Sequence, residues 1–373
     1  MTSRGTLKKI ALFVPSFRGG GAERAMLLFA DGLLSLGYQV DFLVAQDEGP
    51  LKSSLPDGVR LFDLAQKKVS FTLPSLVRYL RRERPAALYS TIVNANITAI
   101  FARAVAHIRC PVVIRESNVV NPKQGVTISR KASGLIAPFI YRLADSIISV
   151  SEAVADELCA SAPSLRKKIS VLPNPVISEK IHELANAPLN HPWFPLGGEQ
   201  YAVSPVIVGA GRLHPQKDFS TLISAFAEVR KTRPLHLLIL GEGSERPKLE
   251  EQVVRLGLGQ DVSLPGHVEN PFPYLKRAQT FVLSSRYEGM PNALLQAMAF
   301  GTPVVATECH SGAREVVTNT EFGRLVPVGN VPAMAAAIAD CLLLPRSASA
   351  AEFIEERFSV KRATEEYLHV AGL

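Results

Sequence analysis

Two cations that follow a glycine turn are the residues of this sequence best suited to chemistry. Gly209, Gly211 and Arg212 come directly after the apolar run at 206–208, and Lys217 lies five residues beyond Arg212. Arginine offers phosphate oxygens a planar fork of N–H donors, and lysine offers a compact charge. Two such cations in a loop after a strand suit a diphosphate, although two solvated surface cations would give the same pattern.

A carboxylate beside the start of a helix is the second candidate. After the apolar run at 281–283 the sequence reads SSRYEGMPN, and a helical pattern begins near Pro291, a residue favoured in the first turn of a helix. The N–H groups of that turn, at residues 292–294, are predicted to be free to hold a phosphate. Glu288 would repel that phosphate, so we interpret it as a ligand for hydroxyl groups, as on a sugar; a helix-capping acid is the alternative.

Glycines follow two further apolar runs. Residues 19–21 are all glycine and open the first helical pattern, where a close backbone approach and free N–H groups suit an anion; a plain strand-to-helix turn is the alternative. Gly241 and Gly243 favour a tight turn. The sequence contains no G-x-G-x-x-G motif, which argues against an NAD-dependent oxidoreductase.

Short apolar runs alternate with amphipathic helical patterns along most of the chain, and they form two series. The first comprises 10–14, 40–45, 87–89, 112–114, 147–150 and 169–172, and the second comprises 206–208, 237–240, 262–264, 281–283 and 304–306. Helical patterns occur at 23–36, 221–231, 248–255 and 358–373. Strands that are apolar on both faces and alternate with helices predict parallel sheets covered on both sides. The sequence therefore predicts an α/β protein of two Rossmann-like domains, with a ligand in the cleft between their facing strand ends.

The composition is that of an ordinary globular protein. Of 373 residues, 47% are hydrophobic and 20% are charged, which excludes disorder, collagen and coiled coils. No apolar run approaches the roughly 18 residues that span a bilayer. The four cysteines are far apart and lack metal-ligand spacing. These features predict a cytoplasmic protein with buried thiols and no metal site.

Together these segments resemble a known family. The chain is similar to the retaining, nucleotide-sugar-dependent glycosyltransferases of family four (glycosyltransferase group one), which have the GT-B fold and act in bacterial polysaccharide or lipid-linked glycan assembly. The resemblance covers nearly the whole chain and lies in an ordered set of segments: 19–23, 151–152, 173–176, 208–213 with 216–217, 240–243, 265–268 and 285–298.

The resemblance implies a division of labour among three parts of the chain. Residues 1–176 would bind the acceptor, residues 177–357 would bind the nucleotide-sugar, and residues 358–373 would form a helix that packs back on the first domain. The donor would be bound by Gly20, Gly21, Gly211, Arg212, Lys217, Gly241, His267, Val268, Glu288, Gly289, Met290, Pro291, Asn292, Ala293 and Gln296. Arg212 and Lys217 would hold the diphosphate, Glu288 the sugar hydroxyls, and His267 and Val268 the base, with UDP assigned by analogy.

Two positions depart from the family pattern. Relatives usually carry a second glutamate eight residues after the first, for the ribose hydroxyls, and this sequence has Gln296 there. Glutamine retains neutral hydrogen bonds, so weaker nucleotide binding is expected. Many relatives also place a histidine near the sugar, and Glu116, beside Arg115, is the candidate for that place; a structural salt bridge of Arg115 is the alternative.

The resemblance also implies the reaction. Glu288, Lys217, Arg212 and Glu116 are the predicted catalytic residues of a hexosyl transfer by front-face displacement, in which the leaving diphosphate takes the acceptor proton. No cofactor or metal is expected, because cations would neutralise the diphosphate and no Asp-x-Asp motif is present. A nucleotide-sugar epimerase and a non-catalytic nucleotide-sugar-binding partner are the alternatives, and Gln296 is the feature that favours the second.

Charge predicts where the acceptor binds. Residues 1–178 hold 23 Lys and Arg against 13 Asp and Glu, whereas residues 179–373 hold 18 against 21. Cations beside apolar residues suit an anionic bilayer, and thus a glycan or polyprenyl-linked acceptor at the inner face of the cytoplasmic membrane; a solvated basic face is the alternative. No aromatic residues interleave with the cations, which argues against nucleic acid. The cations form three clusters, the second of which precedes the apolar stretch 135–140: Arg78, Arg81, Arg82 and Arg84; Lys123, Arg130 and Lys131; and Arg166, Lys167 and Lys168.

Overall fold

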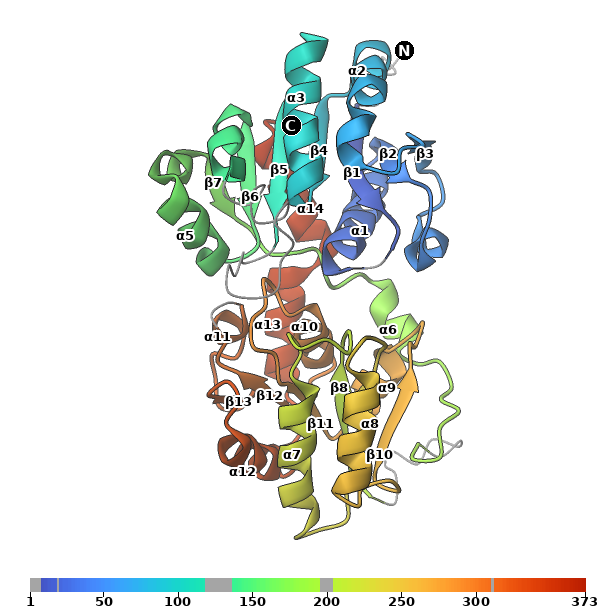
Figure 1. Cartoon of the computed structure of the whole chain (residues 1–373), viewed down its shortest axis with the longest axis vertical. Coiled ribbons are helices and arrows are strands. Elements are labelled where there is room, and N and C mark those ends of the chain that lie inside the picture. The colour runs from blue at the N-terminus through green and yellow to red at the C-terminus, as the bar shows by residue number, and fades with distance from the viewer. Residues whose placement is uncertain (1–7, 19, 118–135, 195–203, 310–311) are drawn as a thin grey trace. The chain divides into compact units, whose positions relative to one another are not determined.

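The computed structural model describes residues 8–18, 20–117, 136–194, 204–309 and 312–373 (Figure 1). Internal contacts divide the chain into two compact units. Unit 1 comprises Met1–Val176 and Val360–Leu373, and unit 2 comprises Ile177–Ser359. The sequence places the corresponding divisions after residues 176 and 357.

Unit 1 contains a parallel sheet of seven strands in the order β3-β2-β1-β4-β5-β6-β7. Six of the strands overlap the predicted apolar runs. The seventh, β3, was not predicted, because at the edge of the sheet its residues are half exposed and include Arg60 and Asp63. The strands are β1 (Lys9–Ser16), β2 (Gln39–Gln46), β3 (Arg60–Asp63), β4 (Ala87–Thr91), β5 (Val112–Glu116), β6 (Ser146–Ser149) and β7 (Ile169–Val171).

Helices cover both faces of this sheet. Along β1, Ala11 and Phe13 face one hydrophobic core, and Ile10 and Leu12 face the other. The helices α2 (Leu73–Glu83) and α3 (Val93–Ala106) contribute to the first core, whereas α1 (Gly21–Ser35) and α14 (Val360–Val370) contribute to the second. The remaining helical elements of unit 1 used below are η2 (Val69–Thr72), η3 (Tyr141–Leu143) and α5 (Glu152–Ser161).

The last helix packs directly on the first. A Cβ atom on Gly32 of α1 would lie 2.1 Å from Oγ1 of Thr364, so glycine permits a close crossing of α1 and α14. The hydroxyl of Tyr89 donates a hydrogen bond of 2.8 Å to the carbonyl of Tyr367. The helical pattern predicted at 358–373 is in fact split, because one helix ends at Phe358 and α14 begins two residues later.

Unit 2 contains a parallel sheet of six strands in the order β10-β9-β8-β11-β12-β13. Five strands overlap the predicted runs, and β13, again at an edge and half exposed, was missed. The strands are β8 (Val206–Ala210), β9 (His236–Leu240), β10 (Val262–Gly266), β11 (Thr280–Leu283), β12 (Val304–Thr307) and β13 (Gly323–Val326).

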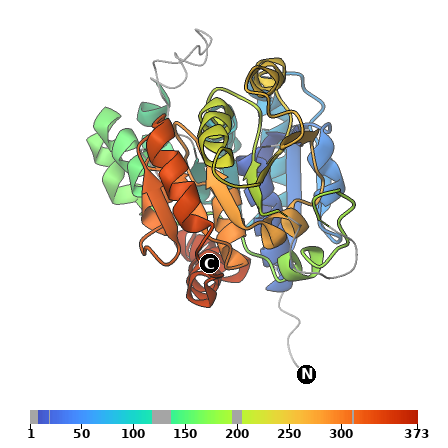
Figure 2. The same cartoon turned by 90° about the horizontal axis from the view of Figure 1, so that it is seen from below.

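The helices of unit 2 also occupy both faces of the sheet. Side chains of α7 and α12 share one core, and Figure 2 shows these two helices side by side. Helix α10 instead packs against α9 and α13. The helices are α6 (Lys180–Leu184), α7 (Phe219–Arg230), α8 (Arg246–Arg255), α9 (Phe272–Arg277), α10 (Asn292–Ala299), α11 (Ala313–Val316), α12 (Val331–Cys341) and α13 (Ala348–Phe358).

Three of the four thiols are buried, as predicted. Cys159 is the exception, because it is half buried. Burial raises the pKa of Cys110 to about 12 and that of Cys341 to about 11. None of the helices in the described residues combines the length and the apolar character needed to cross a bilayer.

A stacked aromatic cluster in unit 2 is expected to make the free energy of unfolding depend on pH. The ring of Trp193, the chain's one tryptophan, stacks on His236 at 4.3 Å between centroids, and His191 lies 5.0 Å from the same ring. Burial lowers the pKa of both histidines. At a pH between the two pKa values, the unfolded chain binds more protons than the folded chain. The free energy of unfolding therefore decreases as the pH falls below the unfolded pKa of about 6.5 toward the lower pKa of the folded chain.

We therefore expect the free energy of unfolding, followed by tryptophan fluorescence, to be lower at about pH 5.5 than at about pH 7.5. The variant His236→Phe retains an aromatic ring and cannot titrate, so the difference between the two pH values should shrink. An unchanged difference in this variant would show that His236 is not responsible.

Candidate functional site

The loops that follow β8 and β11 form the candidate site of unit 2. These strands are neighbours in the sheet, and β8 has β9 on its other side. The chain therefore crosses over in opposite directions after β8 and after β11, toward α7 and α10 respectively. A sheet opens a ligand crevice at the carboxyl ends of two such strands. The two segments that the sequence singles out, 211–217 and 284–292, lie at this point.

An ion pair joins the two loops. Lys217 Nζ donates a hydrogen bond to Glu288 Oε1, and the hydroxyl of Ser285 donates to the same oxygen at 2.6 Å. Glu288 is 6% exposed, and the Lys217 side chain is 19% exposed. The two residues predicted to meet different parts of a donor are therefore partners in this structure. Ser285 was missed by the sequence analysis, although a hydroxyl three residues before a carboxylate is a local signal that could have identified it.

Glycines make room for the Lys217 side chain. Gly211 has a φ of +153°, and a Cβ atom there would lie 2.9 Å from Cε of Lys217. Gly241 has a φ of +143°, and its Cβ would lie 1.9 Å from the carbonyl oxygen of Gly211. Backbone hydrogen bonds fix this contact: Gly211 N–H donates to Leu240 at 2.9 Å, and Gly241 N–H donates to Gly266 at 2.8 Å. The predicted tight turn at Gly241 thus supports the lysine loop.

Further hydrogen bonds lock the two loops together. The Gln216 amide donates to the carbonyl of Tyr287 at 2.9 Å, and Arg286 N–H donates back to the carbonyl of Gln216 at 2.8 Å. The hydroxyl of Ser284 donates to the carbonyl of Lys217 at 2.7 Å. These three hydrogen bonds therefore hold the backbone on both sides of the ion pair, which fixes its position before any ligand binds.

The other predicted donor contacts lie nearby but are more exposed. Arg212 is exposed, and its charge acts on Tyr287, whose pKa is raised by burial and by Glu288 and lowered by Arg212. His267 is exposed and Val268 half buried, directly after β10. Both residues follow the carboxyl end of β10, which is separated from β8 in the sheet by β9.

The start of α10 differs from the prediction. Asn292 N–H donates to the carbonyl of Met290 at 3.0 Å, and Leu294 N–H donates to the carbonyl of Pro291 at 2.9 Å. Two of the three N–H groups predicted to be free are therefore used within the turn itself, so that prediction is wrong for them. Among the described residues, none accepts a backbone hydrogen bond from Ala293 N–H. Gly289 is buried beside this turn, so only a narrow part of the helix start can receive an anion.

Gln296 lies one helical turn further along α10. The residue is 8% exposed, but its amide atoms are not among the buried side-chain atoms of the described residues that lack a hydrogen-bond partner. Its amide can donate and accept hydrogen bonds to a polar ligand although it carries no charge.

The candidate residues of unit 1 lie at the carboxyl ends of β1 and β5. Gly20 is the N-cap of α1 and Gly21 its first residue. Glu116 is 3% exposed and accepts a hydrogen bond of 2.8 Å from the hydroxyl of Tyr141, whose pKa is raised mainly by burial and further by Glu116. Tyr141 was missed because no local pattern links it to Glu116.

Arg115, beside Glu116, is 1% exposed. Its guanidinium donates to the hydroxyl of Thr91 at 3.0 Å and to the amide oxygen of Asn174. Its hydrogen-bond partners among the described residues are thus a hydroxyl and an amide rather than a carboxylate, so the structural salt bridge considered from the sequence is absent there. Arg115 instead anchors the segment at Asn174 to the sheet.

Several predicted residues lie outside the described part of the chain. They are Gly19, Lys123, Arg130, Lys131 and Leu135. Within the described residues, no group of three or more His, Cys, Asp and Glu side chains is arranged to hold a metal ion.

Two family models match the chain. Residues 19–180 match the model described as Glycosyltransferase Family 4, and residues 204–343 match the model described as Glycosyl transferases group 1. The first match lies in unit 1 except for residues 177–180, and the second lies within unit 2 and contains both Lys217 and Glu288.

Curated relatives match over most of the chain. The N-acetylgalactosamine-N,N'-diacetylbacillosaminyl-diphospho-undecaprenol 4-alpha-N-acetylgalactosaminyltransferase of Campylobacter jejuni is 28% identical over 344 residues, 88% of each chain. The lipopolysaccharide core biosynthesis glycosyltransferase LpsE of Rhizobium meliloti is 25% identical and covers 95% of this chain and 96% of its own. An uncharacterized glycosyltransferase of Methanocaldococcus jannaschii is 32% identical, but the match covers 55% of this chain and about half, 49%, of that protein.

Solved structures share the fold. HepE of Anabaena, crystallised in complex with UDP-glucose, superposes with a TM-score of 0.78 over 98% of this chain and 100% of its own, at 19% identity. At that identity the similarity establishes the common fold of the two proteins.

Proposed function

Because the chain belongs to the glycosyl transferases of group 1, with a glycosyltransferase family 4 domain ahead of the group 1 domain, we propose that it transfers a sugar from a UDP-sugar to a hydroxyl group of a lipid-linked glycan, with retention of the anomeric configuration. The observation that carries this proposal is the ion pair of Lys217 and Glu288 at the switch point between β8 and β11. A cation and a carboxylate in one crevice suit a ligand that presents phosphates beside hydroxyl groups.

The ion pair gives the site two states. In the free protein Glu288 neutralises Lys217. When a donor binds, its diphosphate competes for the lysine, and the displaced carboxylate accepts hydrogen bonds from the sugar hydroxyls. Ser285 continues to hold Glu288 Oε1, so the carboxylate stays in place during the exchange.

The proposed reaction is a front-face displacement. The bond between the anomeric carbon and the diphosphate oxygen breaks, and the acceptor oxygen forms a bond to that carbon on the same face. The acceptor proton passes to the departing UDP. Lys217 and Arg212 stabilise the negative charge that develops on the leaving diphosphate, in place of a metal ion, and Glu116 is proposed to act on the sugar or the acceptor from unit 1.

The donor and acceptor classes draw support from the relatives. HepE was solved with UDP-glucose, and the Campylobacter jejuni relative is named for an acceptor carried on undecaprenyl diphosphate. We propose that this chain likewise uses UDP rather than another base, and that it works as a cytoplasmic enzyme, peripheral on the membrane that carries the acceptor.

A donor screen tests the proposal. Purified protein is incubated with UDP- and GDP-sugars, and release of the nucleoside diphosphate is measured with and without EDTA. Slow hydrolysis of a UDP-sugar that resists EDTA is expected, with the anomer of the first product, read by NMR, matching the donor. Binding of a donor without hydrolysis would favour the alternative of a non-catalytic nucleotide-sugar-binding partner, and failure to bind any of these donors would contradict both.

Gln296 allows a gain of affinity to be predicted. The variant Gln296→Glu would offer the ribose hydroxyls charge-assisted hydrogen bonds, which are stronger than neutral ones by about 1 kcal/mol, so UDP should bind about fivefold more tightly by calorimetry. The free variant should be less stable, because a carboxylate is then buried without a partner.

The matched control for this variant is Gln252→Glu. Gln252 is equally buried in unit 2, but its amide donates to the carbonyl of Ser220 and to the hydroxyl of Ser224, both at 2.9 Å. This control should lose stability with no change in UDP affinity. Weaker UDP binding by Gln296→Glu would remove Gln296 from the donor site.

A further inference from the structure

The outer surface of α3 is unusually apolar for an exposed helix. Its sequence, VNANITAIFARAVA, contains one charged residue, Arg103, whose guanidinium donates to the carbonyl of Leu143 and pairs with Asp145. Phe101 and Val105 are 42% and 47% exposed and lie one turn apart. A helix at the surface normally presents polar residues to water, so this face is suited to a partner.

The apolar surface continues beyond α3. Phe139 and Leu143, at and beside η3, are both more than half exposed. On the other side of α3, toward α2, lies a groove of about 690 Å³. The groove is lined by Leu73, Pro74, Val77 and Val105 together with Arg78, Arg81 and Arg82. We refer to Phe101, Val105, Phe139, Leu143 and this groove as the α2–α3 face.

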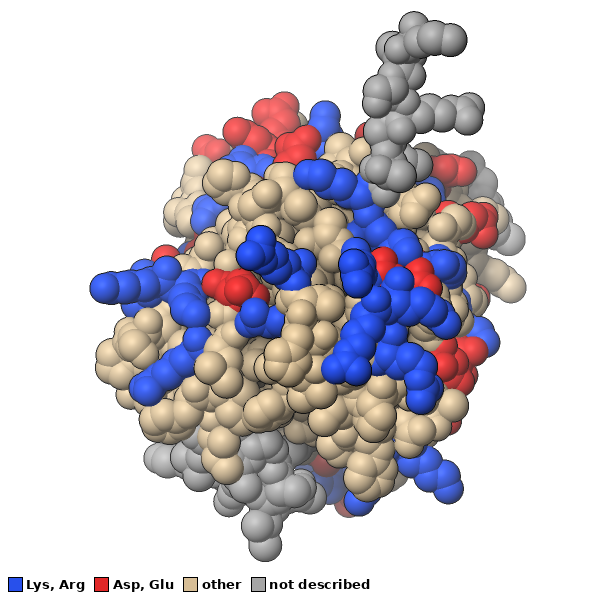
Figure 3. Space-filling view, turned by 90° about the horizontal axis from the view of Figure 1, so that it is seen from above, with Lys and Arg blue, Asp and Glu red and all other residues tan. Residues whose placement is uncertain are grey.

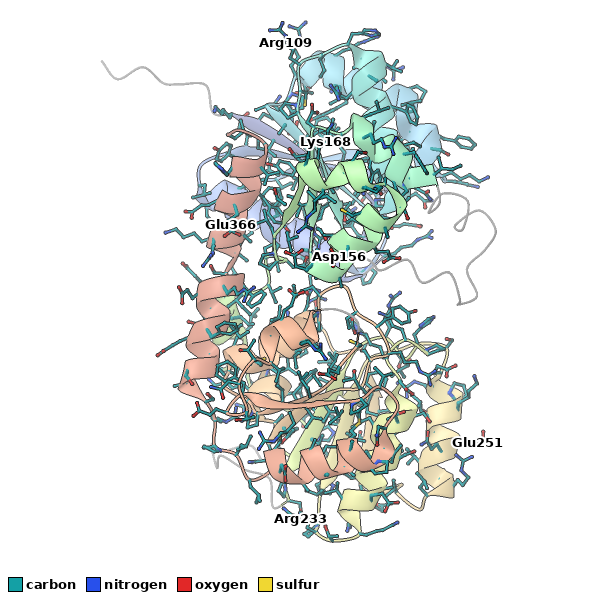
Figure 4. All side chains as sticks on the ribbon, turned by 90° about the vertical axis from the view of Figure 1, so that its left-hand side faces the viewer. Arg109, Asp156, Lys168, Arg233, Glu251 and Glu366 are labelled. Atoms are coloured by element: carbon teal, nitrogen blue, oxygen red, sulfur yellow. The ribbon has the colours of Figure 1, made fainter. Side chains whose placement is uncertain are left out.

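Cations flank the α2–α3 face on both sides. Arg78 is exposed on α2, and on the other side the guanidinium of Arg142 lies 5.1 Å from the ring centroid of Phe139. Figure 3 shows Lys and Arg side chains gathered around uncharged ones at this end of unit 1, and in Figure 4 Arg109 points away from the sheet just beyond α3.

Nearby acids do not offset these cations. Glu83 forms ion pairs with Lys9, Arg60 and Arg82, and hydrogen bonds from Lys9 and Arg60 lower its pKa to about 2. Asp145 pairs with Arg103. The acids of α2 and of the residues next to η3 are therefore already neutralised, and the net charge of the face is positive.

We propose that the α2–α3 face docks on an anionic phospholipid bilayer. Headgroup phosphates meet Arg78 and Arg142, and the apolar side chains of Phe101 and Val105 enter the boundary between headgroups and acyl chains. A second copy of this chain would bring the same cations against each other, so charge favours an anionic occupant. This inference rests on the proposed function, because it names the surface through which the enzyme meets the membrane that carries its acceptor.

Vesicle co-sedimentation tests the surface without any donor or acceptor. The probe is phosphatidylcholine vesicles with and without about 30% phosphatidylglycerol, at about 50 mM and about 500 mM salt. The native chain should sediment with anionic vesicles at low salt, and binding should weaken at high salt or without phosphatidylglycerol.

Two variants locate the contact. Arg78→Glu with Arg142→Glu reverses the flanking charge, and Phe101→Asp with Val105→Asp removes the apolar contact. Each pair is expected to weaken binding to anionic vesicles roughly tenfold or more. Thermal unfolding and donor hydrolysis in solution should be unchanged, which separates failure of the surface from failure of the enzyme.

Matched controls carry the same changes elsewhere. Arg255→Glu with Lys361→Glu changes the net charge by the same amount as Arg78→Glu with Arg142→Glu. Arg255 lies on α8 of unit 2, and Lys361 lies on α14, the helix on the other face of the unit 1 sheet. Val254→Asp replaces a residue that is 76% exposed in unit 2. These controls should bind vesicles as the native chain does.

Three outcomes would overturn the proposal. The first is no binding of the native chain to anionic vesicles at low salt. The second is equal loss of binding in the variants and the matched controls. The third is a concentration-dependent dimer that Phe101→Asp with Val105→Asp abolishes, which would assign the face to a second copy of the chain.

Discussion

Replacing Lys217 by alanine is expected to reduce sugar transfer by about a hundredfold to a thousandfold. The lysine is the less exposed of the two cations, Lys217 and Arg212, that the loop after β8 offers to a diphosphate leaving group. Without it the charge on the departing UDP is poorly stabilised. The loss should appear mainly in kcat, and it is measured as the initial rate of transfer or of donor hydrolysis.

The same substitution has a structural effect that must be separated from the chemical one. It leaves Glu288, which is 6% exposed, without its cation, and this should lower the melting temperature. The double variant Lys217→Met with Glu288→Gln removes both charges and should recover much of the stability. Its activity should stay as low as that of Lys217→Ala, because stability alone does not restore the missing charges.

A second ion pair provides the control. Arg286 pairs with Asp218 at 3.1 Å and joins the same two loops, but the sequence and the structure give it no role toward the donor. The variant Arg286→Gln should therefore keep most of the activity. Normal transfer by Lys217→Ala, or equal losses in the two variants, would contradict the assignment of Lys217.

Replacing Gly241 by alanine is expected to destabilise unit 2 by about 3 kcal/mol and to abolish detectable UDP binding. The new Cβ would lie 1.9 Å from the carbonyl oxygen of Gly211. The residue also has a φ of +143°, a backbone conformation that residues other than glycine rarely adopt. The backbone of Gly211 must then move. Because the side chain of Lys217 lies against Gly211, the diphosphate site moves with it.

Calorimetry with UDP and thermal unfolding measure these effects. A change of about 3 kcal/mol corresponds to a shift of roughly 10 °C for a unit of this size. Gly257→Ala and Gly259→Ala are the controls: Gly257 has a φ of +69° with open space around its Cβ position, and Gly259 has open space and no positive φ. The first control should lose a little stability, the second almost none, and both should bind UDP normally.

If Gly241→Ala bound UDP as well as Gly259→Ala does, the glycine contact would have no part in the site. That result would also question the link between the predicted tight turn at Gly241 and the position of Lys217. Thermal unfolding and UDP affinity are measured on the same samples by different methods, so a loss of UDP binding can be distinguished from a loss of folded protein.

Interior strands and the residue types of the site could be predicted from the sequence. Runs such as 10–14 and 281–283 are apolar on both faces because helices cover both faces of a parallel sheet. β3 and β13 lack that pattern because exposed or half-exposed residues such as Arg60 and Arg324 interrupt their apolar residues, and both were missed, whereas the edge strands β7 and β10 overlap predicted runs. The GT-B fold inferred from the ordered motifs is confirmed by the family matches and the shared fold of HepE.

Local sequence determined that a glycine turn precedes Lys217 and that Glu288 stands before a helix, because turns and helix starts depend on neighbouring residues. Tertiary structure decided that Lys217 and Glu288, 71 residues apart, form one ion pair, since β8 and β11 are adjacent only through sheet pairing. It also decided that the N–H groups of Asn292 and Leu294 are occupied and that Tyr141 reaches Glu116. Such contacts join separate elements, and no spacing along the chain encodes the distance between them.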